Sequence, residues 1–272
     1  MKLHQGATDA RARGLAALEL LRLGSLPDRL AEGIAAQAMT GEAGLGAELR
    51  ADLLLELARL GASGVKPESR LGPTKKTLAA LRSMLPRDDR RVIASLLYES
   101  GMLIAAGRPF AAPALSADAY SFSRSRELED EALLAHGICL LAGEKVPEAL
   151  KVLQELAAVP GRKDRSFTCR LDLCLGVAYT RAGDPVKGRD SFSRAGDGSL
   201  CANGAVALFN PEACKEMTTR VRRLSFQTDD NAPETPVLLA RVLLFPRIRP
   251  VEKPLRWRSG DTGDRARQEF LS

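Results

Sequence analysis

The chain has 272 residues, and its 40 basic and 34 acidic residues leave a net charge of +6. Aromatic residues make up only 4% of it, whereas leucine and alanine, which are strong helix formers, recur throughout. This composition argues against a sheet-based fold, which needs more aromatic and β-branched residues. Charges of both signs are interspersed, which argues against a dedicated nucleic-acid-binding surface. We therefore expect an all-helical protein.

The first part of the chain, residues 1–60, predicts N-terminal helices. Apolar residues at helical spacing favour one helix over residues 9–23, a second that begins near Ser25, and a third over residues 47–60. These helices lack the small-residue pattern found later in the chain, so degenerate repeats are one interpretation of them. Residues 61–74 contain three glycines and two prolines, which predicts a linker.

Residues 75–225 carry the strongest helical pattern. Helices are expected over residues 75–84, 88–106, 113–120, 129–142, 146–156, 170–181, 185–194, 200–209 and 211–224. Short turns that contain glycine or proline separate the two members of most pairs. We therefore expect this region to fold as successive helix pairs.

Within this region the sequence repeats itself. Gly137 and Gly176 lie 39 residues apart, and each is followed three residues later by a large apolar or aromatic residue. A glycine in the middle of a helix lets a second helix pack closely, and the second helix supplies a small residue followed by a large one. The residues predicted to make this packing are Gly101, in a weaker copy, and Gly137, Leu140, Ala149, Leu153, Gly176, Tyr179, Gly188 and Phe192. A period in the high thirties is typical of helix-pair solenoids.

The end of the chain has a different composition. Residues 226–236 contain two adjacent aspartates and two prolines and predict a linker, and the apolar run 237–245 predicts a capping helix. Residues 246–272 are basic and rich in proline and arginine, which predicts a disordered tail. Five tail residues suit contacts with nucleic acid or with an acidic protein surface: Arg247, Arg249, Arg256, Trp257 and Arg258.

No residue pattern assembles a catalytic or metal-binding site. The two histidines, His4 and His136, are far apart, and the five cysteines lack the spacing of metal ligands. We predict no catalytic residues, no metal, no cofactor and no enzymatic activity. The odd number of cysteines without close pairs predicts reduced thiols. Without a secretory signal or an apolar run of about 20 residues, we expect an intracellular protein that enters no membrane, cytoplasmic rather than nuclear.

The helix pair predicted over residues 170–181 and 185–194 resembles a known repeat family. The run Leu175-Gly176-Val177-Ala178-Tyr179 is followed by Ala182-Gly183-Asp184 and then by Phe192 and Ala195. This order resembles the tetratricopeptide repeat, although the spacings of 36 and 39 residues differ from the 34 residues of that family. Asp172 also stands where the family prefers a bulky apolar residue. The resemblance implies an all-α helix-turn-helix repeat solenoid with a disordered C-terminal tail.

In that family the first helices of successive repeats line a concave groove that receives peptides. The resemblance implies that nine residues line such a groove here: Glu131, Leu134, Ile138, Leu141, Arg170, Leu173, Val177, Thr180 and Arg181. Its apolar centre would accept a helix or an extended peptide. Alternatively, the apolar members simply pack against a neighbouring helix. We expect a non-catalytic adaptor that binds a protein or peptide; a nucleic-acid-associated protein that uses the basic tail is the alternative.

Overall fold

The structure is a computed structural model of the whole chain. It describes residues 45–62, 67–160, 165–196 and 211–226, together with Ala12, residues 14–18, Leu21, Leu30, Gly33, Ala36 and Thr235. Most of the helices predicted before residue 45 lie outside the described residues. The same holds for the helices predicted over 200–209 and 237–245, for nearly all of the linker 226–236 and for the tail 246–272. Those expectations stay predictions.

The described part of the chain is helical and contains no strand. Its elements are α3 (Ala47–Ala62), α4 (Pro67–Met84), α5 (Arg90–Ala105), the 3-10 helix η1 (Pro109–Ala111), α6 (Ala112–Phe122), α7 (Arg126–Ala142), α8 (Val146–Ala158), α9 (Arg165–Arg181), α10 (Pro185–Arg194) and α12 (Pro211–Ser225). None of these helices combines the length and the apolar character needed to cross a bilayer. The all-helical prediction is confirmed for these residues.

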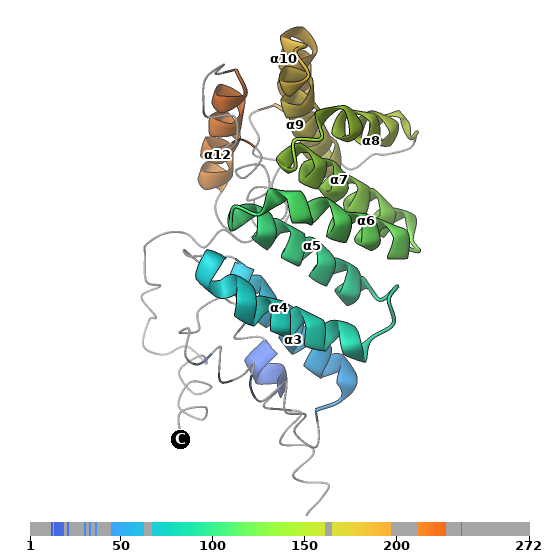
Figure 1. Cartoon of the computed structure of the whole chain (residues 1–272), viewed down its shortest axis with the longest axis vertical. Helices are drawn as coiled ribbons and strands as arrows, with labels where there is room; N and C mark the ends of the chain where they lie inside the picture. Colours follow the sequence, from blue (N-terminus) through green and yellow to red (C-terminus); the bar gives the residue numbers. More distant parts are fainter. Residues whose placement is uncertain are drawn as a thin grey trace, which may run out of the picture.

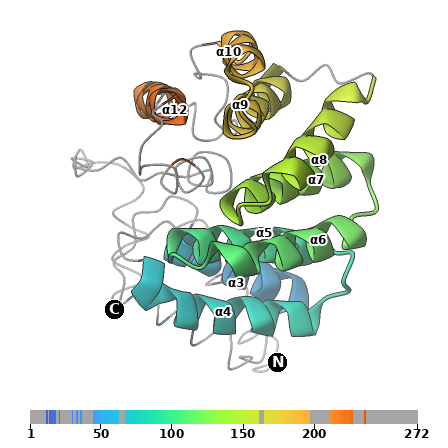
Figure 2. The same ribbon diagram turned by 45° about the horizontal axis from the view of Figure 1, so that its top comes forward.

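Successive helices pack side by side and form a stack (Figure 1). α3 packs against α4, α5 against α6, α7 against α8 and α9 against α10, and each pair contacts the next. Figures 1 and 2 show α12 beside α9, on the side opposite α8. One apolar cluster extends from α5 to α10 and includes Val221 and Leu224 of α12. A second cluster joins α3 and α4 to Ala17, Leu18 and Leu21 near the N-terminus.

Helix α3 extends to Ala62 and helix α4 begins at Pro67, so the prediction of a linker over residues 61–74 is wrong for residues 61–62 and from Pro67 onward. Proline is tolerated in the first turn of a helix, because the first backbone amides have no helical partner. Pro73 lies inside the helix, where it removes a hydrogen bond. The neighbouring Leu71 is buried in the main apolar cluster. This burial helps to offset the local cost of Pro73.

The turns of the three hairpins α5–α6, α7–α8 and α9–α10 share one backbone geometry. Each contains a residue with positive φ: Gly107 (70°), Glu144 (62°) and Gly183 (84°). The N–H of this residue donates to a carbonyl three residues earlier, and the next N–H donates to a carbonyl five residues earlier. This pattern satisfies the last carbonyls of the helix. The same turn therefore recurs at intervals of 37 and then 39 residues.

Inside two of the hairpins, a glycine of the first helix contacts a large side chain of the second. A Cβ atom on Gly137 would lie 2.6 Å from Cδ2 of Leu153, and one on Gly176 would lie 2.5 Å from the ring of Phe192. Gly188 is similarly close to α9. The structure thus brings together the pairs on which the repeat pattern rests. The remaining predicted packing residues are Gly101, Leu140 and Ala149, which are buried, and Tyr179, which is half-buried.

We predict that Gly176→Ala destabilises the protein by about 1–3 kcal/mol, because the added methyl group overlaps the Phe192 ring. Gly46→Ala is the matched control, since Gly46 is exposed just before α3 and an added Cβ atom meets nothing within 4 Å. The control should change stability by less than about 1 kcal/mol, because glycine and alanine differ only modestly at the start of a helix. Urea denaturation measures both changes, and equal stabilities of the two variants would contradict the close contact.

Candidate functional site

The residues predicted to line a groove lie on α7 and α9. The five apolar members are at most 2% exposed: Leu134, Ile138, Leu141, Leu173 and Val177. Side chains buried this deeply cannot contact a partner in this conformation. The expectation of an open apolar groove is therefore wrong for these five residues, which instead pack against neighbouring helices.

The α7 residues of this set lie on the seam between two neighbouring helices. An α-helix has about 3.6 residues per turn, which places Leu134 and Ile138 between the directions of Gly137 and Glu131. Gly137 faces Leu153 of α8, whereas Glu131 binds a side chain of α9. Leu134 and Ile138 are therefore buried where α7 meets α8 and α9.

The α9 residues Leu173 and Val177 belong to the same apolar cluster as Val221 and Leu224 of α12. Gly176 faces α10, and Arg170 faces α7. By the same helical geometry, Leu173 and Val177 lie between these two directions. α12 contacts α9 and lies opposite α8 (Figures 1 and 2). We call the side of α9 on which α12 packs the α9 face.

Arg170 holds α9 against α7. Its two terminal nitrogens donate to the carboxylate of Glu131 at 2.8 and 2.5 Å. Its guanidinium also lies 5.3 Å from the ring centroid of Phe167. Arg170 is only 3% exposed, and its partner lies 39 residues earlier, at the equivalent position of the preceding hairpin. A bidentate contact of this kind fixes the orientation of the two side chains as well as the distance between them.

The other polar residues predicted for the groove also serve the structure. Nη1 of Arg181 donates to the carbonyl oxygen of Leu141 at 3.0 Å. Burial lowers the pKa of Arg181, and the nearby charge of Glu144 opposes this shift. The Thr180 hydroxyl donates to the carbonyl oxygen of Gly176 at 2.8 Å. These contacts support the hairpins, so neither Arg181 nor Thr180 identifies a ligand.

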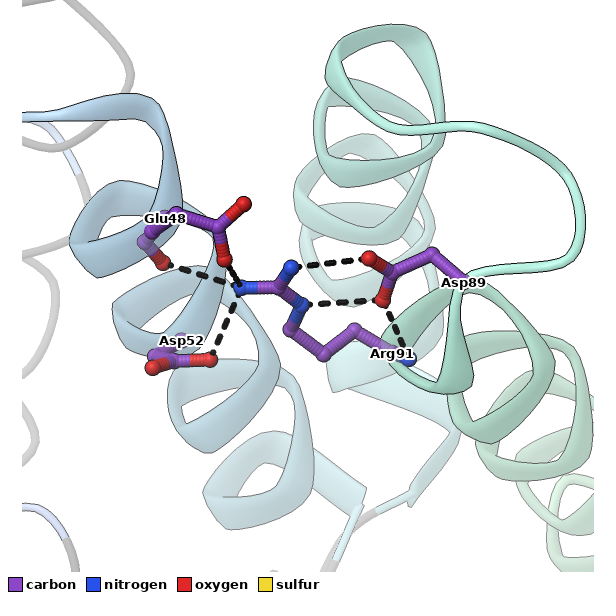
Figure 3. Close-up of polar contacts among 4 residues, drawn as sticks. All are labelled: Glu48, Asp52, Asp89 and Arg91. Atoms are coloured by element: carbon purple, nitrogen blue, oxygen red, sulfur yellow. Dashed lines mark hydrogen bonds and ion pairs between the residues drawn. The ribbon is translucent and has the colours of Figure 1, made fainter.

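A cluster of charged residues ties the first turn of α5 to α3 (Figure 3). Asp89 caps α5 by accepting from the backbone N–H of Arg91 at 2.8 Å, and its carboxylate also accepts from Nε and Nη2 of the Arg91 side chain at 2.9 and 2.8 Å. Nη1 of Arg91 reaches the carboxylates of Glu48 and Asp52 on α3. The hydrogen bond from Arg91 lowers the pKa of Asp89, and the acidic partners raise the pKa of Arg91.

Two further buried acids are paired across helices, and sequence reasoning did not foresee either pair. Glu99 of α5 is 3% exposed, and its two oxygens lie 2.8 Å from Arg82 and 3.2 Å from Lys75, both on α4. Asp172 of α9 accepts from Nε of Arg194 on α10 at 2.9 Å. The latter pair explains how an aspartate is accommodated at a position where the tetratricopeptide repeat prefers an apolar residue. No residue spacing in the sequence predicts these pairs, because they form only when the helices pack together.

One contact has the geometry of a nucleophile and its base. The Ser116 hydroxyl lies 2.9 Å from Nδ1 of His136, within the range seen in catalytic pairs. Ser116 is 0% exposed, however, and its oxygen also lies 3.2 and 3.0 Å from two carbonyl oxygens of its own helix. Burial lowers the pKa of His136, with a smaller contribution from Lys145. Since no substrate can reach Ser116, this contact serves the packing of α6 on α7.

The described cysteines differ in oxidation state. Cys139 and Cys174 are buried and reduced, as the sequence predicted. Burial raises the pKa of Cys139 to about 12 and raises that of Cys174 as well. Cys169 is disulfide-bonded, so the expectation of reduced thiols is wrong there. Protonated, buried thiols are poor nucleophiles, which argues against a reactive site at Cys139 or Cys174.

Among the described residues, no group of three or more His, Cys, Asp or Glu side chains could hold a metal ion. The predicted contact residues of the tail lie outside the described part of the chain: Arg247, Arg249, Arg256, Trp257 and Arg258. No protein-family model, curated protein or solved structure matches the sequence or the fold. Geometry alone therefore defines the candidate site, which is the α9 face together with the α12 helix that lies against it.

We predict that Asp89→Asn lowers stability at neutral pH and that its difference from wild type disappears in acid. Asparagine keeps the helix cap but removes the charge that pairs with Arg91. The pKa of Asp89 in the folded state lies below the ordinary value of 3.8. The ion pair therefore contributes above that pH, and the contribution is lost as the pH falls through the folded-state pKa. Urea denaturation from about pH 7 to pH 2 measures this, and a pH-independent difference would count against it.

The coupling of Glu131 and Arg170 is testable by a double-mutant cycle. Glu131→Leu alone should cost about 1–3 kcal/mol, because it removes the carboxylate from a buried guanidinium. Glu131→Leu combined with Arg170→Met should recover much of this loss, since no charge is then buried in the seam. Denaturation of the wild type, both single variants and the double variant gives the coupling energy. Additive losses would show that the two side chains are energetically independent.

Proposed function

We propose that this protein is a non-catalytic scaffold that binds another protein, built as a helix-turn-helix repeat solenoid similar to the tetratricopeptide repeat. The observation that carries the proposal is the recurrence of one hairpin in atomic detail. Three turns share a backbone geometry and hydrogen-bond pattern, and the close glycine contact of Gly137 recurs at Gly176. Units of this kind contact mainly their neighbours and build extended surfaces.

The α9 face is the binding surface that this proposal favours. α12 already lies against this face, and its residues Val221 and Leu224 share an apolar cluster with Leu173 and Val177 of α9. Helix-in-groove recognition uses apolar surfaces of this type, on which a partner helix places side chains three or four residues apart. The partner segment would therefore be an amphipathic helix, and the protein would hold its partner in place without catalysing a reaction.

A second candidate function is nucleic-acid association through the basic tail. The supporting feature is the sequence between Arg247 and Arg258, in which four arginines accompany Trp257. Arginine and an aromatic ring suit phosphates and unpaired bases. Binding of this kind weakens steeply with salt, whereas an apolar protein contact does not, so salt separates the two functions.

The proposed function predicts a protein partner whose capture depends on the third hairpin. Tagged full-length protein should co-purify that partner after nuclease treatment and in high salt, as measured by quantitative mass spectrometry. Gly176→Leu should lose the partner, because a leucine side chain at this contact forces α9 away from α10. Gly46→Ala should retain it, because the space beside Gly46 is open.

Two results would reject the proposed function. In one, the recovered proteins are the same for Gly176→Leu and wild type. In the other, recovery depends on nucleic acid and disappears when Arg247, Arg249, Arg256 and Arg258 are replaced by glutamine. The latter result would show that the tail is the binding element and that the helices only support it.

A further inference from the structure

Helix α12 lies against α9 (Figure 2), and its residues Val221 and Leu224 belong to the same apolar cluster as Leu173 and Val177. In a scaffold that binds helices, this is a surface on which a partner helix would lie. We propose that α12 is an intramolecular ligand of the α9 face, and that an amphipathic helix of a partner protein binds there by displacing it. The inference rests on the proposed function and specifies the chemistry of the partner segment.

The side-chain pattern of α12 is that of a helix bound in a groove. Its inward residues Thr218, Val221 and Leu224 recur every three positions and are buried, whereas Glu216 and Arg223 are exposed. Residues three or four positions apart share one side of a helix. A competing helix therefore needs aliphatic side chains at this spacing and a polar opposite side.

Contacts with α10 set the orientation of α12. Nη2 of Arg222 donates to the carbonyl oxygen of Phe192 at 2.9 Å. The ring of Phe226, just after α12, packs edge-on against the Phe192 ring with centroids 5.6 Å apart. Both contacts lie near the C-terminal end of α12. They define how the helix is aligned, while its apolar side provides the burial.

The fit of α12 is incomplete at one position. Thr218 is 0% exposed, and its hydroxyl has no hydrogen-bond partner. A hydroxyl that leaves water without gaining a partner destabilises the docked state. By contrast, every residue from 169 to 178 of α9 is buried. Elements with fewer buried contacts open at lower free energy than central ones, so α12 can leave α9 while the hairpin stays folded.

α12 stays attached to the protein when it leaves the α9 face. Sixteen residues separate Arg194, the last residue of α10, from Pro211, the first of α12. A tethered helix has a high effective concentration at its docking surface, so a free helix of equal intrinsic affinity competes poorly. Weakening the docking of α12 should therefore make the α9 face available to an added peptide.

The test uses full-length protein and a fluorescein-labelled peptide with the sequence of residues 211–226. Full-length Val221→Asp/Leu224→Asp should bind this peptide about tenfold more tightly than wild type, because its own α12 no longer competes. Thr219→Asp/Arg223→Asp is the matched control, since both positions lie on the exposed side of α12. The control should bind as weakly as wild type. Fluorescence anisotropy compares the three proteins, and equal affinities would overturn the proposal.

A second measurement does not depend on how the variants fold. In wild-type protein, the amides of α12 should exchange with solvent about a hundredfold faster than those of α9, because α12 detaches alone. Equal protection of the two helices would overturn the proposal. Peptide binding without any co-purifying protein partner would support the α12 contact and reject the proposed function. A specific protein partner, together with equal amide protection of α12 and α9, would support the proposed function and reject the displacement of α12.

Discussion

The close approach of paired helices at a glycine is the contact on which much of this structure depends. Leu153 and Phe192 lie where Gly137 and Gly176 leave no side chain in the way. A larger residue would push the two helices of each hairpin apart, because packed interiors have little spare volume. The common turn reinforces the contact, since it brings each second helix back at a fixed angle. Hairpins built alike can then stack in the same manner.

Tight stacking has a consequence for the charged residues of the central helices. α7 and α9 are covered by neighbours on nearly every side, so a charge on either helix needs a partner within the protein. Arg170 and Glu131 satisfy each other across the seam, and Asp172 is satisfied by Arg194. Similar pairing holds Glu99 between α4 and α5. These charges therefore orient helices, and their burial is no sign of catalysis.

The same architecture explains the place of α12. α12 covers part of the last described hairpin, since it contacts α9 and places Val221 and Leu224 in the main apolar cluster. In the proposal that a partner helix displaces α12, this one contact serves both the packing of α9 and the binding of the partner.

Sequence alone determined the features that depend on neighbouring residues. The helical class, most helix positions after residue 75, the turns and the glycine contacts follow from local propensity and from the spacing of small and large residues. Sequence failed where distant helices decide the outcome. The run of glycine and proline before residue 75 indicated a linker, but burial of Leu71 accompanies a helix there.

At the candidate site, too, some features follow from local sequence and others depend on distant helices. The sequence placed Leu173 and Val177 on one side of a helix, because residues four apart share a face. It could not tell whether that side meets solvent, a partner or another part of the chain. Only the tertiary structure decided that α12 packs against this helix and shares an apolar cluster with these two residues. The physical reason is that periodicity defines an apolar face within one helix, whereas burial depends on which other helix reaches that face.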